Sequence, residues 1–240
     1  MPVLASLADA TVSYDTHDAL AAVSLEIQRG AVTVVVGHNG SGKSTLLGVL
    51  AGTTALSSGT LDWADFDPSP GRIGFVPQHA KLPERFPMTV QAAVAMGRWA
   101  RRTNPDARWW RARRNGRTHA DAQLTAEAIE ALGLAGLRRR LLSELSGGQR
   151  QRALIAQGIA QDTELLLLDE PTAGVDDESS QRIAECLAGL AARGKAVVVA
   201  SHDTDEIAAA DAVITLRDGR VVGGDPVIAG VTSRSPSSLG

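Results

Sequence analysis

The sequence is short of cysteine, with Cys186 as the single example in 240 residues. One thiol cannot form a disulfide within the chain, so a disulfide-stapled secreted scaffold is excluded and the composition fits a reducing compartment. Cys186 falls in a helical pattern with Ile183 and Leu187. We therefore interpret it as a small buried hydrophobic residue rather than a reactive thiol.

Long apolar runs are also missing. The longest ones, residues 165–168 and 196–200, have the length of a core strand and fall far short of the ~20 residues that span a bilayer. The first ten residues lack the basic stretch and the apolar stretch of a signal peptide, so we expect none. If the protein acts at a membrane, we expect another chain to cross it.

No charge of one sign dominates. The formal net charge is −3, which gives no global reason to expect a nucleic-acid partner. The content that is present, 44% hydrophobic and 21% charged residues, is ordinary for a globular protein and argues against disorder. A chain of this length can bury one substantial core, or a core split into two lobes.

Strand patterns alternate with helical patterns along most of the chain, and no internal repeat is present. Residues 12–27 alternate between apolar and polar, as antiparallel strands with one solvated face do. Continuous apolar runs predict buried strands at 31–36, 165–168 and 196–200, and shorter strands are expected at 60–63, 73–76, 213–216 and 220–222. Helical spacing predicts helices around 46–50, 90–96, 124–132, 147–160, 177–193 and 203–210.

This order predicts an α/β fold with a mainly parallel sheet, an N-terminal antiparallel β subdomain and an inserted helical subdomain. We expect a single domain over residues 1–230. Its core would take up about 1–85 and 161–230, and the helical subdomain about 86–160. Residues 231–240 are rich in Ser, Pro and Gly, which favours a flexible tail.

A glycine-rich loop follows the first buried strand and precedes a helix. It matches the pattern G-x-x-x-x-G-K-[ST] and consists of Gly37, His38, Asn39, Gly40, Ser41, Gly42, Lys43 and Ser44, with Thr45 next. Glycines let backbone N–H groups wrap a phosphate, and the helix N-terminus adds positive charge. Lys43 can reach the β- and γ-phosphates, and the Ser44 hydroxyl can ligate Mg²⁺. The loop predicts a P-loop NTPase core that binds ATP with Mg²⁺.

The buried strand at 165–168 ends in two carboxylates, Asp169 and Glu170. At the carboxyl end of a strand beside the phosphate loop, Asp169 can bind Mg²⁺ directly or through water. Glu170 can polarise the attacking water as a general base. The pair is a candidate for the hydrolytic part of the site.

A second anion-binding pattern opens the helix at 147–160. Ser146 is a natural N-cap, and Gly147 and Gly148 leave the first backbone N–H groups bare, with Gln149 following. This stretch resembles the signature motif of ABC-transporter ATPases. The resemblance covers residues 3–225, with the motifs in the order of that family.

The resemblance implies roles for four further residues. Tyr14 matches the aromatic residue that stacks on adenine, and Gln78 matches the glutamine that touches Mg²⁺ and couples to the membrane partner. Asp176 matches the aspartate of the D-loop, and His202 matches the switch histidine that contacts the γ-phosphate. Catalysis is thereby expected of Glu170, His202 and Gln78.

Two positions depart from the common pattern of that family. Ala173 replaces a frequent serine of the D-loop, and His38 stands where the phosphate loop often has proline. Neither change removes a phosphate or magnesium ligand. The family also implies a head-to-tail homodimer, because the signature motif of one copy completes the ATP site of the other.

The segment between Gln78 and Ser146 faces the membrane subunit in this family. Residues 86–90 and 96–98, together with 173–176, resemble the manganese- and zinc-type metal importers of bacteria, while similar segments occur in iron-chelate and haem importers. The resemblance implies a separate permease, indirectly a periplasmic or lipoprotein solute-binding protein, and a peripheral position on the cytoplasmic side of the cell membrane. The five histidines are scattered, as expected of a subunit that never touches the cargo.

Residues 98–117 are rich in arginine and tryptophan. Two interpretations stay open, a solvated arginine-rich face and a contact with anionic headgroups or the membrane subunit. Nucleic acid is not expected, since the rest of the chain is not basic. A non-transport ATPase of the cell-division type remains an alternative function, and export in place of import is not excluded.

Overall fold

The computed structural model describes residues 1–15, 17–69, 71–78, 87–102 and 119–222. The first part of the chain forms an antiparallel sheet of three strands in the order β2-β1-β4. Its strands are β1 (Val3–Tyr14), β2 (His17–Gln28) and β4 (Ser58–Asp62). The predicted N-terminal antiparallel strands are thereby confirmed.

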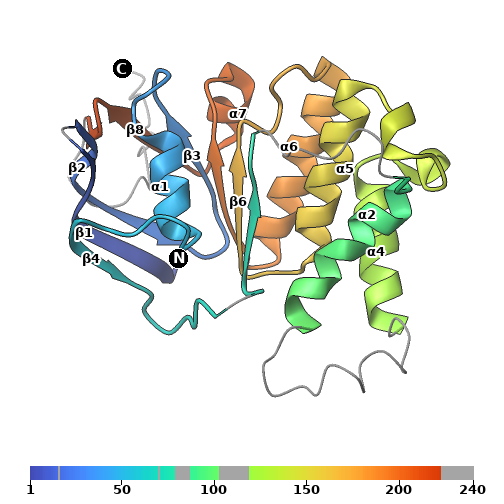
Figure 1. Cartoon of the computed structure of the whole chain (residues 1–240), viewed down its shortest axis with the longest axis horizontal. Helices are drawn as coiled ribbons and strands as arrows, with labels where there is room; N and C mark the ends of the chain where they lie inside the picture. Colours follow the sequence, from blue (N-terminus) through green and yellow to red (C-terminus); the bar gives the residue numbers. More distant parts are fainter. Residues whose placement is uncertain (16, 70, 79–86, 103–118, 223–240) are drawn as a thin grey trace, which may run out of the picture.

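A second sheet has six strands in the order β5-β6-β7-β3-β8-β9. Its first five strands are parallel and β9 runs antiparallel to β8, so the prediction of a mainly parallel sheet is confirmed. The strands are β5 (Ile73–Val76), β6 (Leu165–Asp169), β7 (Ala196–Ala200), β3 (Val32–Val36), β8 (Ala212–Arg217) and β9 (Arg220–Val221). Figure 1 shows the antiparallel sheet, the parallel sheet and the helices side by side.

Helices cover both faces of the parallel sheet. In Figure 1, α1 lies between this sheet and the antiparallel one, α5 and α6 lie on the opposite side, and α2 and α4 lie beyond them. The α-helices are α1 (Lys43–Leu50), α2 (Val90–Met96), α4 (His119–Ala131), α5 (Gly147–Ala160), α6 (Asp177–Ala192) and α7 (Thr204–Ala209). The 3₁₀ turns, which sequence spacing did not reveal, are η1 (Gly97–Arg102), η2 (Ala135–Leu137) and η3 (Leu142–Glu144).

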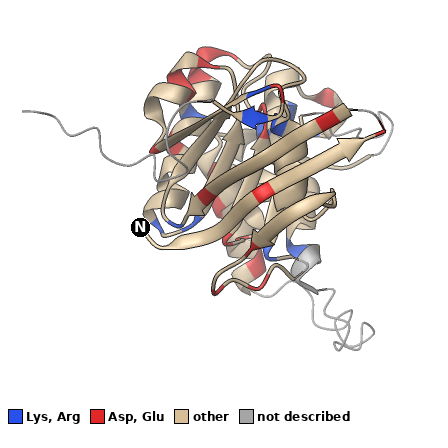
Figure 2. Ribbon diagram, turned by 90° about the vertical axis from the view of Figure 1, so that its left-hand side faces the viewer, with Lys and Arg blue, Asp and Glu red and all other residues tan. Residues whose placement is uncertain are grey.

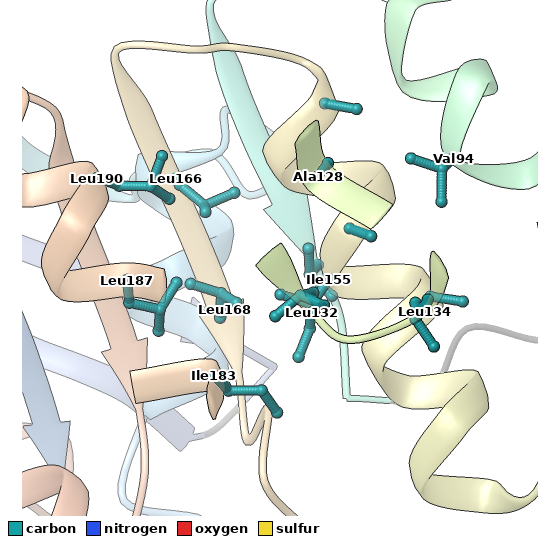
Figure 3. Close-up of a cluster of buried hydrophobic side chains, with 14 of the residues drawn as sticks. Val94, Ala128, Leu132, Leu134, Ile155, Leu166, Leu168, Ile183, Leu187 and Leu190 are labelled. Atoms are coloured by element: carbon teal, nitrogen blue, oxygen red, sulfur yellow. The ribbon is translucent and has the colours of Figure 1, made fainter. Parts of the chain in front are cut away.

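The parallel sheet separates two hydrophobic cores. Along β6, Leu165 and Leu167 belong to the core shared with β1, β2 and α1, whereas Leu166 and Leu168 belong to the core shared with α2, α4, α5 and α6. Figure 3 shows Leu166 facing Leu190 and Leu168 facing Leu187, both of α6. Because both faces are covered, the strand is apolar throughout, which explains its continuous run in the sequence. Truncating one such leucine to alanine would cost about 2–5 kcal/mol.

The antiparallel sheet carries only one sign of charge. Its three strands contain Asp9, Asp18, Glu26 and Asp62 and no lysine or arginine. Figure 2 shows these strands across the front of the molecule, with scattered acidic positions.

Cys186 is half-buried on α6 and packs against the core that α2, α4, α5 and α6 share. It is therefore less buried than the sequence predicted. Burial raises the pKa of its thiol above the ordinary value, which keeps the thiol protonated at neutral pH. Within the part of the chain that the structure describes, no helix has the length and apolarity to span a bilayer.

Candidate functional site

The phosphate loop runs from the end of β3 to the start of α1, and close packing requires two of its glycines. A Cβ at Gly37 would lie 2.3 Å from both Ser41 Oγ and Leu216 O. Gly42 has a φ of +104°, and a Cβ there would lie 2.5 Å from Ala19 O. Gly42 is also the N-cap of α1 and supplies no side-chain cap, so the N-terminus of this helix stays available to an anion.

Lys43 stands at the start of α1 with its ammonium held across the loop. Its side chain is only 6% exposed, and Nζ donates to the carbonyl oxygens of Gly37 at 2.8 Å and His38 at 3.4 Å. Nζ also lies 3.9 Å from Oε1 of Glu170. A buried cation with one distant carboxylate is well placed to receive an anionic phosphate.

Three predicted site residues lie together at the carboxyl ends of adjacent strands. Gln78 follows β5, Glu170 follows β6 and His202 follows β7, as ligand sites of parallel sheets commonly do. Gln78 Nε2 donates to Glu170 Oε2 at 2.8 Å, and His202 Nδ1 lies 3.7 Å from Glu170 Oε1. His202 is 71% exposed, so its ring is free to meet a ligand.

Glu170 adopts a backbone conformation that is rare for a side chain of its type. Its φ is +47°, and its N–H donates to Ala200 O on β7 at 2.9 Å. A left-handed residue that is not glycine costs of order 1–3 kcal/mol and persists where its surroundings hold it. The strain turns the carboxylate toward Lys43 and Gln78 instead of along the strand.

A pocket of about 430 Å³ lies over the loop, within the size range of small-molecule sites. Most of the sequence-predicted loop residues line it together with Gln78 and Glu170. The complete lining is His17, Ala19, Asn39, Gly40, Gly42, Lys43, Ser44, Thr45, Gln78 and Glu170. The sequence reasoning missed His17 and Ala19, whose only signal was their closeness in sequence to Tyr14.

Tyr14 and Ser41 lie differently from the other predicted residues. Tyr14 is 54% exposed at the end of β1 and pairs with His17 across the hairpin, so it stands beside the pocket lining rather than in it. Ser41 is buried beneath the loop, and its hydroxyl has no hydrogen-bond partner among the residues that the structure describes. Ser41 O accepts from Gly219 N at 3.1 Å, which ties the loop to the β8–β9 turn. His38 also contacts this turn, with Nε2 3.3 Å from Asp218 Oδ1.

The donors around the pocket suit Mg²⁺. Ser44 and Gln78 in the lining offer a hydroxyl and an amide. Asp169, which is buried at the end of β6 and does not line the pocket, offers a carboxylate. These are hard oxygen donors, and Mg²⁺ typically takes one or two carboxylates plus substrate phosphates. Among the described residues, no group of three or more His, Cys, Asp and Glu could hold a metal by itself. A cation here would need the phosphates of a nucleotide.

The signature loop lies apart from this pocket. Ser146 is the N-cap of α5, with Ser146 Oγ accepting from Gln149 N and Gln149 Oε1 accepting from Ser146 N, both at 3.2 Å. Ser146 and Gly147 are exposed, and a Cβ at Gly147 would meet nothing within 4 Å. The lining of the pocket over Lys43 contains none of Ser146, Gly147, Gly148 and Gln149. Within one chain, the two predicted anion-binding elements do not meet.

Asp176 lies beside the signature loop rather than beside Lys43. It is the N-cap of α6 and accepts from Ser179 N and Ser179 Oγ, each at 3.0 Å. These hydrogen bonds hold the pKa of its carboxyl below the ordinary range. A Cβ at Gly148 would lie 3.7 Å from Asp176 Oδ2, which places the D-loop against the start of α5.

The arginine- and tryptophan-rich segment begins with a structural residue. Arg98 is 9% exposed, pairs with Asp121 of α4 at 2.8 Å, and donates to Ala160 O and Gln161 O at 2.9 Å each. Neither the solvated-face interpretation nor the headgroup interpretation applies to Arg98. Trp99 is exposed. Residues 103–118 and the side chains of 100–102 lie outside the described residues.

Packing also explains part of the pattern that the sequence analysis connected with metal importers. A Cβ at Gly97 would lie 2.1 Å from Gln157 O, so only glycine lets this turn cross α5. Thr89 is the N-cap of α2 and accepts from Ala92 N at 3.2 Å. Phe86 lies outside the described residues. Gly97, Arg98 and Thr89 therefore serve the helical packing itself.

Comparison with known proteins finds relatives of a single family. The family described as "ABC transporter" matches residues 20–173, more than half of the chain. The zinc transport system ATP-binding protein TroB of Treponema pallidum is 34% identical over 226 residues, covering 93% of this chain and 82% of TroB. The manganese transport protein MntB of Listeria monocytogenes is 36% identical, covering 90% and 88%. The hemin import protein HmuV of Streptomyces coelicolor is 37% identical, covering 93% and 78%.

Solved structures agree with the fold. A metal-chelate type transporter in an inward-facing conformation matches with a TM-score of 0.76 and 30% identity, covering 94% of this chain and 84% of that one. The cassette MJ0796, described as dimeric, matches with a TM-score of 0.71 and 27% identity, covering 90% and 96%.

Proposed function

The chain belongs to the ABC transporter family, and from this premise we propose that it is the ATP-hydrolysing subunit of a transition-metal importer, active as a head-to-tail dimer. Family members are ATPases coupled to transport. The observation that carries the dimer is the separation of the Lys43 pocket from the exposed signature loop in one chain. A second copy, as in the dimeric cassette MJ0796, would supply the missing side of each pocket.

The roles of the residues follow from their positions. Lys43 and the N-terminus of α1 bind the β- and γ-phosphates of ATP. Ser44, Gln78 and Asp169 would hold Mg²⁺, which neutralises phosphate charge when bound. Tyr14 stacks on the adenine, and His202 contacts the γ-phosphate. Glu170 accepts a proton from the attacking water.

The signature loop acts in the partner's site. Ser146, Gly147, Gly148 and Gln149 approach the γ-phosphate held by the other copy, and Asp176 holds the loop beside them. ATP therefore favours the closed dimer, because each γ-phosphate gains contacts from both chains. Hydrolysis removes those contacts, and the dimer opens.

We further propose that residues of about 86–160 form the helical subdomain that faces the permease, while about 1–85 and 161–230 form the nucleotide core. The mutual packing of α2, α4 and α5 supports this division. The tail, 231–240, lies outside the described residues. A permease, and through it a periplasmic or lipoprotein solute-binding protein, would place this subunit on the cytoplasmic face of the membrane.

Zinc or manganese is the proposed cargo, because TroB and MntB carry those names. An iron-chelate or haem importer is the second candidate, supported by the 37% identity to HmuV. The cell-division alternative has no observation in its favour. Metal uptake in a deletion strain decides: restored zinc or manganese accumulation by the wild-type chain, and none by Lys43→Ala, is expected. Restored haem uptake alone would move the proposal to the second candidate.

The dimer has its own test. Light scattering of Glu170→Gln with ATP should give twice the monomer mass, because nucleotide that is not hydrolysed keeps the closed state. The same variant without nucleotide is the control. A monomer in both conditions would overturn the head-to-tail site.

A further inference from the structure

A second cavity, of about 260 Å³, lies between α6, α7 and the sheet strands β3 and β7. It shares no lining residue with the pocket over Lys43. Its walls include Val32 and Val34 of β3, Leu187 of α6 and Val199 of β7. The cavity is therefore apolar over much of its surface, and its volume suits a ligand smaller than the drug-sized molecules that fill pockets of ~300–1,000 Å³.

One of the two acidic side chains that line this cavity is buried, while the other lies at its exposed edge. Glu206 of α7 is 9% exposed and is part of the lining. Neither of its carboxyl oxygens has a hydrogen-bond partner of good geometry among the residues that the structure describes. Asp203 accepts from Glu206 N at 3.1 Å, so the backbone of Glu206 is fixed by the helix cap while its side chain is left to the cavity.

Burial of this carboxyl has an electrostatic cost. It raises the pKa of Glu206 above the ordinary value, even though the nearby hydroxyls of Ser201 and Thr172 lower it. A buried carboxylate is stable only with a donor or a cation beside it.

The remaining polar groups of the cavity select the sign of a ligand. Glu185 of α6 also lines it and accepts from Gln181 Nε2 at 3.1 Å. No lysine or arginine stands in the lining that the structure describes. Two carboxyl groups without a basic residue favour a cation and repel an anion.

We propose that this cavity binds a small organic cation, a primary ammonium on a short aliphatic chain. The ammonium donates hydrogen bonds to the carboxylate of Glu206, and the chain packs against Val34, Leu187 and Val199. Glu206 provides the specificity because a neutral molecule of the same shape leaves the charge of its carboxylate uncompensated. The proposal does not depend on the transported cargo or on ATP hydrolysis.

The test is a titration of the whole chain with n-hexylammonium and with n-hexanol, read by calorimetry and by backbone amide shifts. We expect the amine to bind about tenfold or more tightly than the alcohol, since a hydrogen bond between two charged groups is stronger than one from a neutral hydroxyl. The shifted amides should lie in α6, α7 and the ends of β3 and β7. Equal binding of the two probes, or shifts confined to other regions, would overturn the proposal.

Four variants sharpen the result. Glu206→Gln should reduce amine affinity to that of hexanol, whereas Glu185→Gln, at the exposed edge, should change it by less than about threefold. Ala188→Phe fills the cavity from α6 and should abolish binding of both probes with Glu206 intact, which also covers the case of a poorly folded Glu206→Gln. Lys43→Ala should bind the amine normally. Unchanged amine affinity in Glu206→Gln or in Ala188→Phe would refute the site.

Discussion

The chain contains two glycine-rich helix starts, and they differ in what requires their glycines. At the start of α1, Gly37 and Gly42 are required by the chain's own packing, and Lys43 is buried beside them. At the start of α5, a Cβ at Gly147 would meet nothing, and the loop is exposed. The chain's own packing shapes the α1 start, whereas the α5 start is left open, and we propose that it meets a second copy of the chain. Each of the following experiments tests this contrast.

The largest effect is expected at Glu170, the proposed general base beside the α1 start. Glu170→Gln keeps the hydrogen-bonding shape but removes the base, so the turnover number for ATP should fall about 10²–10⁴-fold. ATP affinity should be retained because Lys43 is intact. Phosphate release under saturating ATP measures the turnover number, and calorimetry measures the ATP affinity. Turnover close to that of the wild type would contradict the role of Glu170.

Removal of the buried Lys43 ammonium should weaken the binding of ATP. Lys43→Ala should weaken ATP affinity about 10–100-fold, because a charged hydrogen-bond donor to phosphate is lost. The matched control is Ser146→Arg, which alters the α5 start and should leave the ATP affinity of the monomer unchanged. If both variants lost affinity equally, the contrast between the two helix starts would be wrong.

Mixing these two variants tests where the α5 start acts. Alone, each should be inactive as an ATPase. In a mixed dimer, intact Lys43 of one chain meets intact Ser146 of the other, which restores one site of two. Random pairing makes about half of the dimers mixed, so about a quarter of the wild-type rate should return. No recovery over a range of mixing ratios would exclude shared sites.

The smallest effect is a difference in stability between two glycine substitutions. Gly42→Ala should lower the free energy of unfolding by about 1–3 kcal/mol, because alanine is strained at a φ of +104°. Gly147→Ala should change it by less than about 1 kcal/mol, since the position is open and helical. Urea denaturation without nucleotide measures both. Equal losses would show that the α5 start is also held by its own chain.

Local patterns in the sequence were enough to predict the phosphate loop, the position of Glu170 and the strands, except residues 3–11 of β1. Buried β-branched runs and the spacing of glycines are short-range signals, and the structure brings Gln78, Glu170 and His202 together because their strands are adjacent. Burial of Arg98 depends on carbonyl groups 62 and 63 residues away, which no local pattern reveals. His17 was missed for a similar reason, since it reaches the pocket only through the fold of the β1–β2 hairpin.

The alternation of β6 between two cores has an evolutionary consequence. Deleting or inserting one residue within Leu165–Asp169 would move the side chains on one side of the change to the opposite core, or would displace Glu170 relative to Lys43. Substitutions of similar volume are tolerable there, but a change in length is not. Descendants of this gene can therefore vary the composition of this strand, while the number of its residues stays fixed.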